Sequence, residues 1–224
     1  RIEIEKPNKT RNVTGYIVEL DNDTQPDPLS EAKNFTKYTQ ILRKNAFFDI
    51  RYPKNEALTL PLKDYIERDL SRFEKALYSF DYDTQRYGYK NFIDVDEFVD
   101  YFILMEVFVQ HDTGNLSTFF YKDVNGKFKP VVWDFNNSLG NVSESSDDDY
   151  LIRQFVSVQA PWFTMLIKDE DFIHQVIYRY RQLRAGILSD ERVSAYIQEV
   201  VDYLGPAVDR NFAVWGYSFD PGNL

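Results

Sequence analysis

The stretch "FIDVDEFVDYFILMEVFVQHDTGNLSTFFYKDVNGKFKPVVWDF", residues 92–135, constrains the fold more than any other part of the chain. It opens with the apolar spacing of a helix that begins at Asp94, an N-cap residue followed by Glu97 three positions later. That helix is apolar almost all round, which is typical of a helix buried at the centre of a domain. Its apolar residues are Phe98, Tyr101, Phe102, Met105, Phe108 and Val109.

A β-hairpin is predicted directly after this helix. Two segments rich in aromatic and β-branched residues, "STFFYKD" and "KFKPVVWDF", flank Asn125-Gly126, a strong hairpin-turn signal. In an antiparallel hairpin that turns there, the start of the first strand lies beside the end of the second. We therefore expect Ser117 and Thr118 to lie beside residues 132–134.

Oxygen-bearing side chains gather at the open end of this predicted hairpin. Hard oxygen donors suit Mg²⁺ or Mn²⁺ rather than Zn²⁺. Phosphoryl-transfer enzymes use two such carboxylates, one to orient or deprotonate a hydroxyl and one to hold the metal on the phosphates. The residues are Asp112, Asn115 and Ser117 on one side, and Asp134, Asn136 and Asn137 on the other.

Other interpretations of these residues remain open. Asp and Asn commonly cap turns, and the run from Asp112 to Asn115 has the chemistry of a turn. His111 is either a base or an ordinary hydrogen-bonded histidine. A glycoside hydrolase would also use two carboxylates, and it would need Asp112 and Asp134 roughly 5 to 9.5 Å apart across an open cleft.

The rest of the chain predicts an α+β fold with a strand-rich N-terminal part and a mainly helical body that carries the hairpin as an insertion. Residues 1–5 and 13–21 alternate and indicate two strands of a hairpin, 22–34 indicate a loop, and 37–60 indicate short extended pieces around "FFDIRYP". Helices are expected from Pro61, over 155–167, from Asp169 and from Ser189, the last with a bend at Gly205-Pro206.

The spacing of apolar residues indicates which face of each helix is buried. In the helix from Pro61 these residues are Ile66, Leu70, Phe73, Leu77 and Phe80; over 155–167 they are Trp162, Phe163, Leu166 and Ile167. From Asp169 they are Phe172, Val176, Tyr180 and Leu183; from Ser189 they are Val193, Ile197, Val200, Leu204 and Val208.

Composition limits the function classes. The 224 residues carry a formal net charge of −10, which disfavours nucleic acid as a partner because phosphate backbones are repelled. The absence of cysteine excludes disulfides, thiolate metal sites and a cysteine nucleophile. No apolar run of about 18 residues occurs, so we expect no membrane span.

Residues 92–141 closely resemble the spore-coat protein H (CotH) kinase family in the "IDVD" helix, the hairpin and the "WDF" segment followed by "LGN". "PWFTMLIKDEDF", "RYRQLRAGILSDE" and "DRNFAVW" are similar to the closing helices of that family, and "RIEIE…TGYIVELD" to the handover between its lobes. The resemblance implies the C-terminal lobe of an atypical protein kinase that uses ATP and Mg²⁺ or Mn²⁺. It further implies a protein substrate with an acceptor Ser, and an extracellular, cell-surface or spore-coat location.

Residue by residue, the resemblance makes Asp112 the catalytic-loop aspartate and Asp134 the metal ligand. It makes Ser117 an auxiliary ligand, and it makes Asn136 a replacement for the second aspartate that many members have. Together with Asn137, these residues are expected to bind the nucleotide and its metal. The family's first lobe, with its phosphate-contacting basic residue, precedes the handover strand. We therefore expect residues 1–224 to be a kinase domain that lacks most of the nucleotide-clamping lobe and has weak activity alone. A catalytically silent interaction module of a secreted assembly is the alternative.

Overall fold

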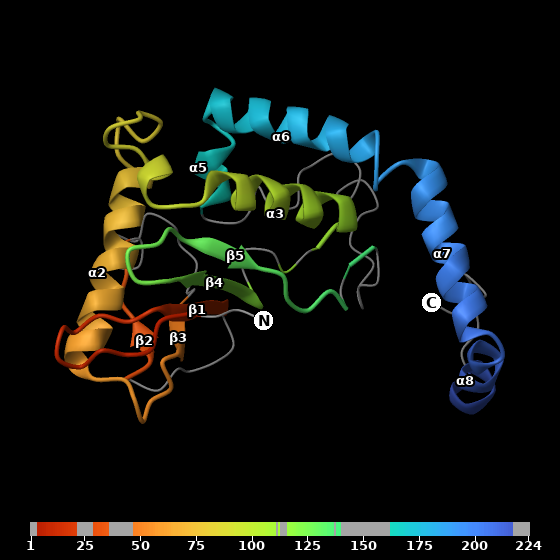
Figure 1. Cartoon of the computed structure of the whole chain (residues 1–224), viewed down its shortest axis with the longest axis horizontal. Coiled ribbons are helices and arrows are strands. Elements are labelled where there is room, and N and C mark those ends of the chain that lie inside the picture. Colours follow the sequence, from red (N-terminus) through yellow and green to blue (C-terminus); the bar gives the residue numbers. More distant parts are fainter. Residues whose placement is uncertain are drawn as a thin grey trace. The chain divides into compact units, whose positions relative to one another are not determined.

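The computed structural model of the chain describes residues 4–21, 29–35, 47–110, 112, 116–136, 138–139 and 162–216 (Figure 1). The fold is α+β, as predicted. The chain divides into two compact units, Arg1–Ile177 and Tyr178–Leu224. All strands and the predicted site residues belong to the first unit.

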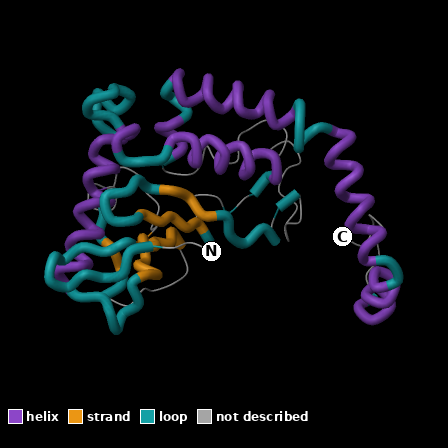
Figure 2. Tube along the Cα trace, viewed as in Figure 1, coloured by secondary structure: helices purple, strands orange, loops and turns teal. Residues whose placement is uncertain are grey.

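A five-stranded antiparallel sheet is the centre of the first unit, and its strands are drawn in orange in Figure 2. The predicted hairpin is part of this sheet and is not a separate insertion, because β4 pairs with the N-terminal strand β1 from Tyr16↔Lys122 to Leu20↔Thr118. The order is β2-β3-β1-β4-β5, with bounds β1 Tyr16–Asp21, β2 Glu31–Ala32, β3 Phe47–Tyr52, β4 Thr118–Lys122 and β5 Lys129–Val131.

Apolar and charged residues alternate along β1 and β3, and both kinds are buried. Tyr16, Val18 and Leu20 of β1 are buried, as are Phe48 and Ile50 of β3. Between them, on the opposite face, two carboxylates of neighbouring strands share one cation. The Arg51 guanidinium bonds Glu19, and it approaches the Asp49 carboxylate to 2.9 Å.

The N-terminal prediction is partly wrong. Within the described residues, Ile4 and Glu5 are not in a strand, although the chain doubles back as expected through the Asn8↔Val13 bridge. β2, by contrast, lies within the stretch 22–34 that we predicted as a loop. A strand of two residues is too short to show a period.

Helix α2, Leu60–Leu77, begins as the sequence predicts. Thr59 is its N-cap and accepts a hydrogen bond from the Leu62 N–H, while Pro61 occupies the first turn, where its missing N–H costs nothing. Ile66, Leu70, Phe73 and Leu77 are buried, but Phe80 lies beyond the helix and is fully exposed. The prediction that Phe80 continues the buried face is therefore wrong.

Helix α3, Val95–Phe108, is the predicted central helix. Asp94 caps it and accepts from the Glu97 N–H at 3.5 Å. The helix packs on the sheet through the Phe98–Phe120 stack and on α6 through Phe102 and Phe172, so it lies between sheet and α6 (Figure 1). Phe98, Tyr101, Phe102 and Met105 are buried, while Phe108 and Val109 are half-buried.

The predicted helix over 155–167 appears within the described residues as the short α5, Phe163–Leu166, and residues 155–161 lie outside the described part. Trp162, Phe163 and Leu166 are buried as expected, and Ile167 is half-buried. Helix α6, Glu170–Arg184, follows. Of its predicted inward residues Phe172 is buried, Val176 and Leu183 are half-buried, and Tyr180 is exposed, which contradicts the prediction.

The second unit contains α7, Asp190–Leu204, and α8, Ala207–Trp215. Ser189 caps α7 through its hydroxyl, as predicted, and the expected bend is a break at Gly205, which has a positive φ of 47°. The predicted inward residues of α7 are not buried.

Among the described helices, none has the length and apolar character needed to cross a bilayer, as the sequence predicts.

Candidate functional site

The hairpin that carries the candidate site turns at Asn125, whose φ of 60° suits the Asn-Gly turn. Phe119 pairs with Val131, so the start of β4 lies beside the segment that follows β5, as predicted. The second strand is shorter than expected and ends at Val131. The two residues that follow it, Val132 and Trp133, are 54% and 59% exposed. Asp134 therefore extends from an exposed segment and not from a buried strand.

The C-terminal end of α3 provides the first fixed point of the site. The Gln110 N–H donates to the Met105 carbonyl at 3.0 Å and the Val109 N–H to the Glu106 carbonyl at 3.3 Å, the two bonds of a Schellman motif. This motif places Val109 in the left-handed region with φ 51°, where glycine is the usual residue. The chain turns sharply there, and the next side chain, Gln110, is buried.

The Gln110 side chain joins the segments of the two candidate aspartates. Its amide nitrogen donates to the Asp134 carbonyl, and its amide oxygen accepts from the Asp112 N–H at 3.4 Å. Gln110 is only 3% exposed, and both hydrogen bonds are partly buried. One amide group thus holds the backbones of Asp112 and Asp134 together.

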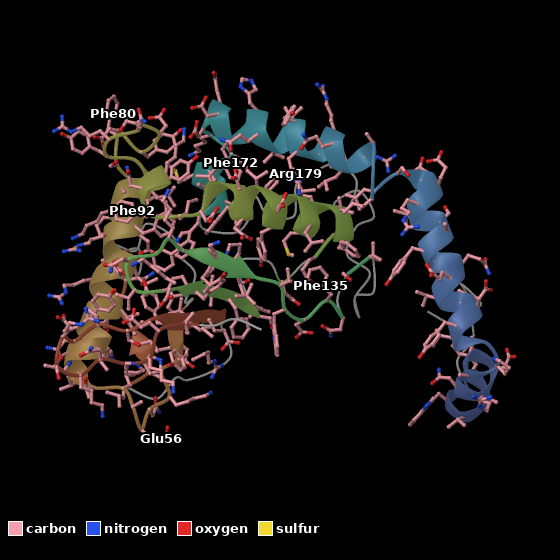
Figure 3. The ribbon with its side chains drawn as sticks, viewed as in Figure 1. Glu56, Phe80, Phe92, Phe135, Phe172 and Arg179 are labelled. Carbon is pink, nitrogen blue, oxygen red and sulfur yellow. The ribbon has the colours of Figure 1, made fainter. Side chains whose placement is uncertain are left out.

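The segment after Asp134 is attached to the same helix end at two further points. The Phe135 ring meets the Phe108 ring edge-on at a centroid distance of 5.7 Å, by the end of α3 (Figure 3). The Leu139 N–H donates to the Phe108 carbonyl at 2.7 Å, which satisfies one of the otherwise unpaired carbonyls of the helix terminus. The "WDF" segment is therefore positioned by its phenylalanine.

The loop that carries Asp112 is attached to β4. The Asp112 carbonyl accepts from the Leu116 N–H at 2.9 Å, and the hydroxyl of the buried Thr118 donates to the Leu116 carbonyl at 2.9 Å. Tyr101 of α3 hydrogen-bonds this hydroxyl, and burial raises the pKa of the Tyr101 phenol, so the ring stays neutral. Asp112 is half-buried, whereas Asp134 is exposed.

The remaining predicted residues are placed as follows. Ser117, half-buried with φ 47°, lies at the start of β4, and Asn136 is exposed two residues after Asp134. Asn137, Asn115 and His111 lie outside the described residues.

Left-handed backbone at non-glycine residues is concentrated here. Val109, Ser117, Asp134 and Leu139 all have φ between 47° and 55°. Such conformations cost on the order of 1–3 kcal/mol each and persist where the surroundings enforce them, often at functional sites. For Val109 the cost is highest, because a β-branched side chain fits this region poorly.

The donor types at this end of the hairpin are those that hard divalent cations prefer. Carboxylate, amide and hydroxyl oxygens come from Asp112, Asp134, Asn136 and Ser117. Within the described residues no group of three or more His, Cys, Asp or Glu side chains could hold a metal. Mg²⁺ in phosphoryl-transfer sites needs only one or two protein carboxylates, with phosphate oxygens and water completing its shell.

Gln110 was not among the residues that the sequence predicted. The only local signal for Gln110 is its position: it is a polar residue directly after an almost wholly apolar helix, two residues before Asp112. That signal equally describes an exposed helix terminus, so sequence alone does not select it.

Comparison with known protein families identifies the family to which this chain belongs. The model of the CotH kinase protein family matches residues 4–221. The chain belongs to the CotH kinase family. The match includes α3, the Asp112 loop, the hairpin and the "WDF" segment, which are the elements that Gln110 joins. CotH kinase membership indicates an atypical kinase function. Comparison with curated proteins and with solved structures gave no match.

Proposed function

We propose that this CotH kinase domain transfers the γ-phosphoryl group of ATP to a serine hydroxyl of an extracellular, cell-surface or coat protein. The observation that supports this most is the joint attachment of Asp112 and Asp134 to one buried amide. Two carboxylates that need different roles in one reaction must keep a constant separation, and a shared backbone anchor provides it.

Asp112 is the residue that orients and deprotonates the acceptor. Its half-buried position in a loop bonded to β4 limits its motion. The serine oxygen attacks the γ-phosphorus, its proton moves to the Asp112 carboxylate, and the bond between the γ-phosphorus and the bridging oxygen breaks, releasing ADP.

Asp134 is the metal-holding residue, with Asn136, Asn137 and Ser117 as further oxygen donors. Bound Mg²⁺ or Mn²⁺ neutralises charge on the ATP phosphates. The exposure of Asp134 supports this role, because a carboxylate that binds a nucleotide-bound cation must reach solvent. The kinase-like C-terminal lobe belongs to the same proposal and is supported by the sequence of α3, loop and hairpin.

The test is Mg-ATP binding measured by titration calorimetry, together with transfer of labelled phosphate to a serine-containing acceptor. Asp134→Asn removes one charge with little change of shape, and we expect it to abolish metal-dependent nucleotide binding while the circular dichroism spectrum stays the same. Asp83→Asn is the matched control, since Asp83 is exposed in the loop after α2.

Unchanged Mg-ATP binding by Asp134→Asn would refute the role of Asp134. If the wild-type protein bound no nucleotide and transferred no phosphate, the proposal would fail as a whole, in favour of a catalytically silent interaction module.

A further inference from the structure

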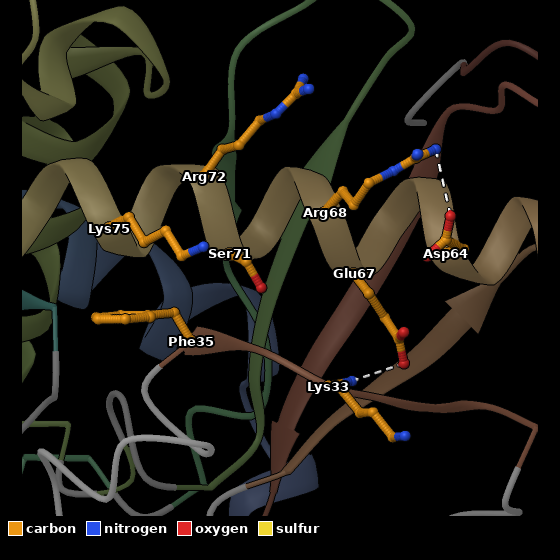
Figure 4. A pocket seen from close by; sticks show the side chains of 8 residues that line it. All are labelled: Lys33, Phe35, Asp64, Glu67, Arg68, Ser71, Arg72 and Lys75. Atoms are coloured by element: carbon orange, nitrogen blue, oxygen red, sulfur yellow. Dashed lines mark hydrogen bonds and ion pairs between the residues drawn. The ribbon is translucent and has the colours of Figure 1, made fainter.

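A polar hollow lies along α2, away from the elements that hold Asp112 and Asp134. Its volume is about 610 Å³, within the range of small-molecule and peptide pockets. Figure 4 shows its side chains along more than two turns of α2, with Lys33 and Phe35 on the facing segment after β2. The lining residues are Lys33, Phe35, Asp64, Glu67, Arg68, Ser71, Arg72 and Lys75.

The hollow is positively charged in a protein whose net charge is −10. Four cations and two carboxylates line it, an excess of two positive charges. Both carboxylates already have partners. Asp64 pairs with Arg68 at 3.4 Å, and Glu67 accepts from the Lys33 N–H at 2.9 Å and lies 3.7 Å from the Lys63 ammonium.

Three of the four cations are not neutralised. Within the part of the chain that the structure describes, the side chains of Lys33, Arg72 and Lys75 form no ion pair with a carboxylate. The Lys75 ammonium instead lies 5.8 Å from the centre of the Phe35 ring, a contact that leaves its charge available (Figure 4). These side chains therefore keep a local positive potential at the hollow.

The spacing of the cations determines which anion they fit. Arg68, Arg72 and Lys75 follow one another at four- and three-residue steps, which separates them by about 6 Å and about 4.5 Å along the helix axis. Such a row does not converge on one phosphoryl group. The step from Arg68 to Arg72 is close to the repeat of side chains on one side of an extended peptide, roughly 6.4–6.8 Å, and the shorter step to Lys75 lies within the reach of its flexible side chain.

We propose that this hollow binds an acidic peptide segment of a partner protein, one whose Asp and Glu side chains lie along α2. Arg72 and Lys75 provide charge that α2 itself does not neutralise, and the Ser71 hydroxyl, which also lines the hollow, offers a hydrogen-bond donor. This binding does not depend on the kinase assignment, because none of the lining residues belongs to the Asp112–Asp134 site.

Fluorescence anisotropy tests the proposal with a labelled ten-residue peptide of alternating Asp or Glu and Gly. The control peptide has the same length, with Asn and Gln in place of the acids. We expect saturable binding of the acidic peptide alone, weakening as salt is added. The double variant Arg72→Gln, Lys75→Gln should bind it about tenfold more weakly, the equivalent of about 1.4 kcal/mol.

A matched double variant separates the hollow from overall charge. Lys54→Gln, Arg192→Gln removes the same two charges at exposed positions outside the hollow and should leave peptide affinity within about twofold. Circular dichroism on both variants confirms that they fold. Equal weakening in both, no weakening in the first, or no binding by the wild-type protein would each overturn the proposal. Tighter binding of a phosphoserine peptide of equal charge would overturn the carboxylate assignment.

Discussion

At the scale of the residue, Gln110 shows how a polar side chain can be structural and functional together. Buried amides that use both their donor and their acceptor stabilise one geometry, since every alternative leaves a group unpaired. Its two bonds end on backbone atoms of Asp112 and Asp134 and do not use their carboxylates. The residue that joins the two segments is therefore distinct from the two candidate site residues themselves.

We predict that Gln110→Met lowers the free energy of unfolding by about 1–3 kcal/mol, because methionine fills a similar volume but leaves the Asp112 N–H and the Asp134 carbonyl without partners. Urea unfolding followed by circular dichroism measures this. The same variant should bind Mg-ATP more weakly than its residual stability explains, since Asp112 and Asp134 lose their common anchor.

Gln198→Met is the control for this prediction. Gln198 lies exposed on α7, where its amide bonds the Asp202 carboxylate at 2.8 Å. A surface contact of this kind contributes little, so we expect a change within about 0.5 kcal/mol. A Gln110 variant as stable as this control would contradict the anchoring role.

At the scale of the element, the N-terminus of α6 is joined to the short helix Tyr89–Asn91 by one buried carboxylate. Asp169 accepts from the Tyr89 hydroxyl at 2.7 Å and pairs with the Lys90 ammonium at 2.9 Å, and it also caps α6 through the Asp171 N–H. Burial opposes the charged form of Asp169, but the hydrogen bonds from Lys90 and Tyr89 outweigh it, and the pKa of Asp169 lies below its ordinary value.

This lowered pKa predicts a pH dependence of stability. The Asp169 contribution is complete above its ordinary pKa of 3.8, and it is lost as the pH falls from there through the lower pKa of the folded state. Asp169→Asn should therefore destabilise the protein by about 1–3 kcal/mol at pH 7, with a smaller difference from wild type at pH 3. Urea unfolding at the two pH values measures both.

Asp171→Asn provides the comparison, because the Asp171 side chain also meets Lys90, at 3.0 Å, but is 75% exposed. An exposed pair of this kind contributes little, and we expect a change below about 1 kcal/mol at either pH. If Asp169→Asn were as mild as Asp171→Asn, or if its effect were the same at pH 3 as at pH 7, Asp169 would not join the two helices as described.

The elements that could be predicted are those with a local cause. The starts of α2, α3 and α7 follow from Thr59, Asp94 and Ser189, whose side chains accept from the first turn of each helix. The hairpin follows from Asn125-Gly126. The two-residue β2 and the exposure of Phe80 have no local cause, because they depend on which strand or helix lies beside them.

The candidate site also has residues that could be predicted from the sequence and residues that could not. Its donor residues could be selected because oxygen-bearing types collect at the open end of a predictable hairpin. Gln110 could not, because its role depends on the left-handed turn at Val109, which no local rule predicts for a β-branched residue. The early end of β5 also could not be predicted, since its apolar sequence continues past Val131.

At the scale of the whole molecule, part of the high aromatic content of 17% is explained by packing inside the first unit. Trp162 contacts aromatic rings from both the sheet and α2. Its ring stacks on Phe48 of β3 at 5.2 Å and meets Phe73 of α2 at 4.6 Å and Phe120 of β4 at 4.6 Å. These buried aromatic residues therefore form a core that connects sheet and helices.

Trp162 also satisfies a buried charge, which gives the last prediction. Its indole N–H donates to the Glu74 carboxylate at 3.0 Å, beside the Asn34 amide at 2.8 Å. Trp162→Ala removes both packing and donor and should cost about 3–5 kcal/mol of unfolding free energy. Trp162→Phe keeps most of the ring and should cost about 1–3 kcal/mol.

Trp133→Ala, at a 59% exposed indole, should stay within about 1 kcal/mol in the same urea experiment. A Trp162→Phe variant as stable as wild type would show that Glu74 does not need this donor, and the connection between α5 and α2 would then rest on ring contacts alone.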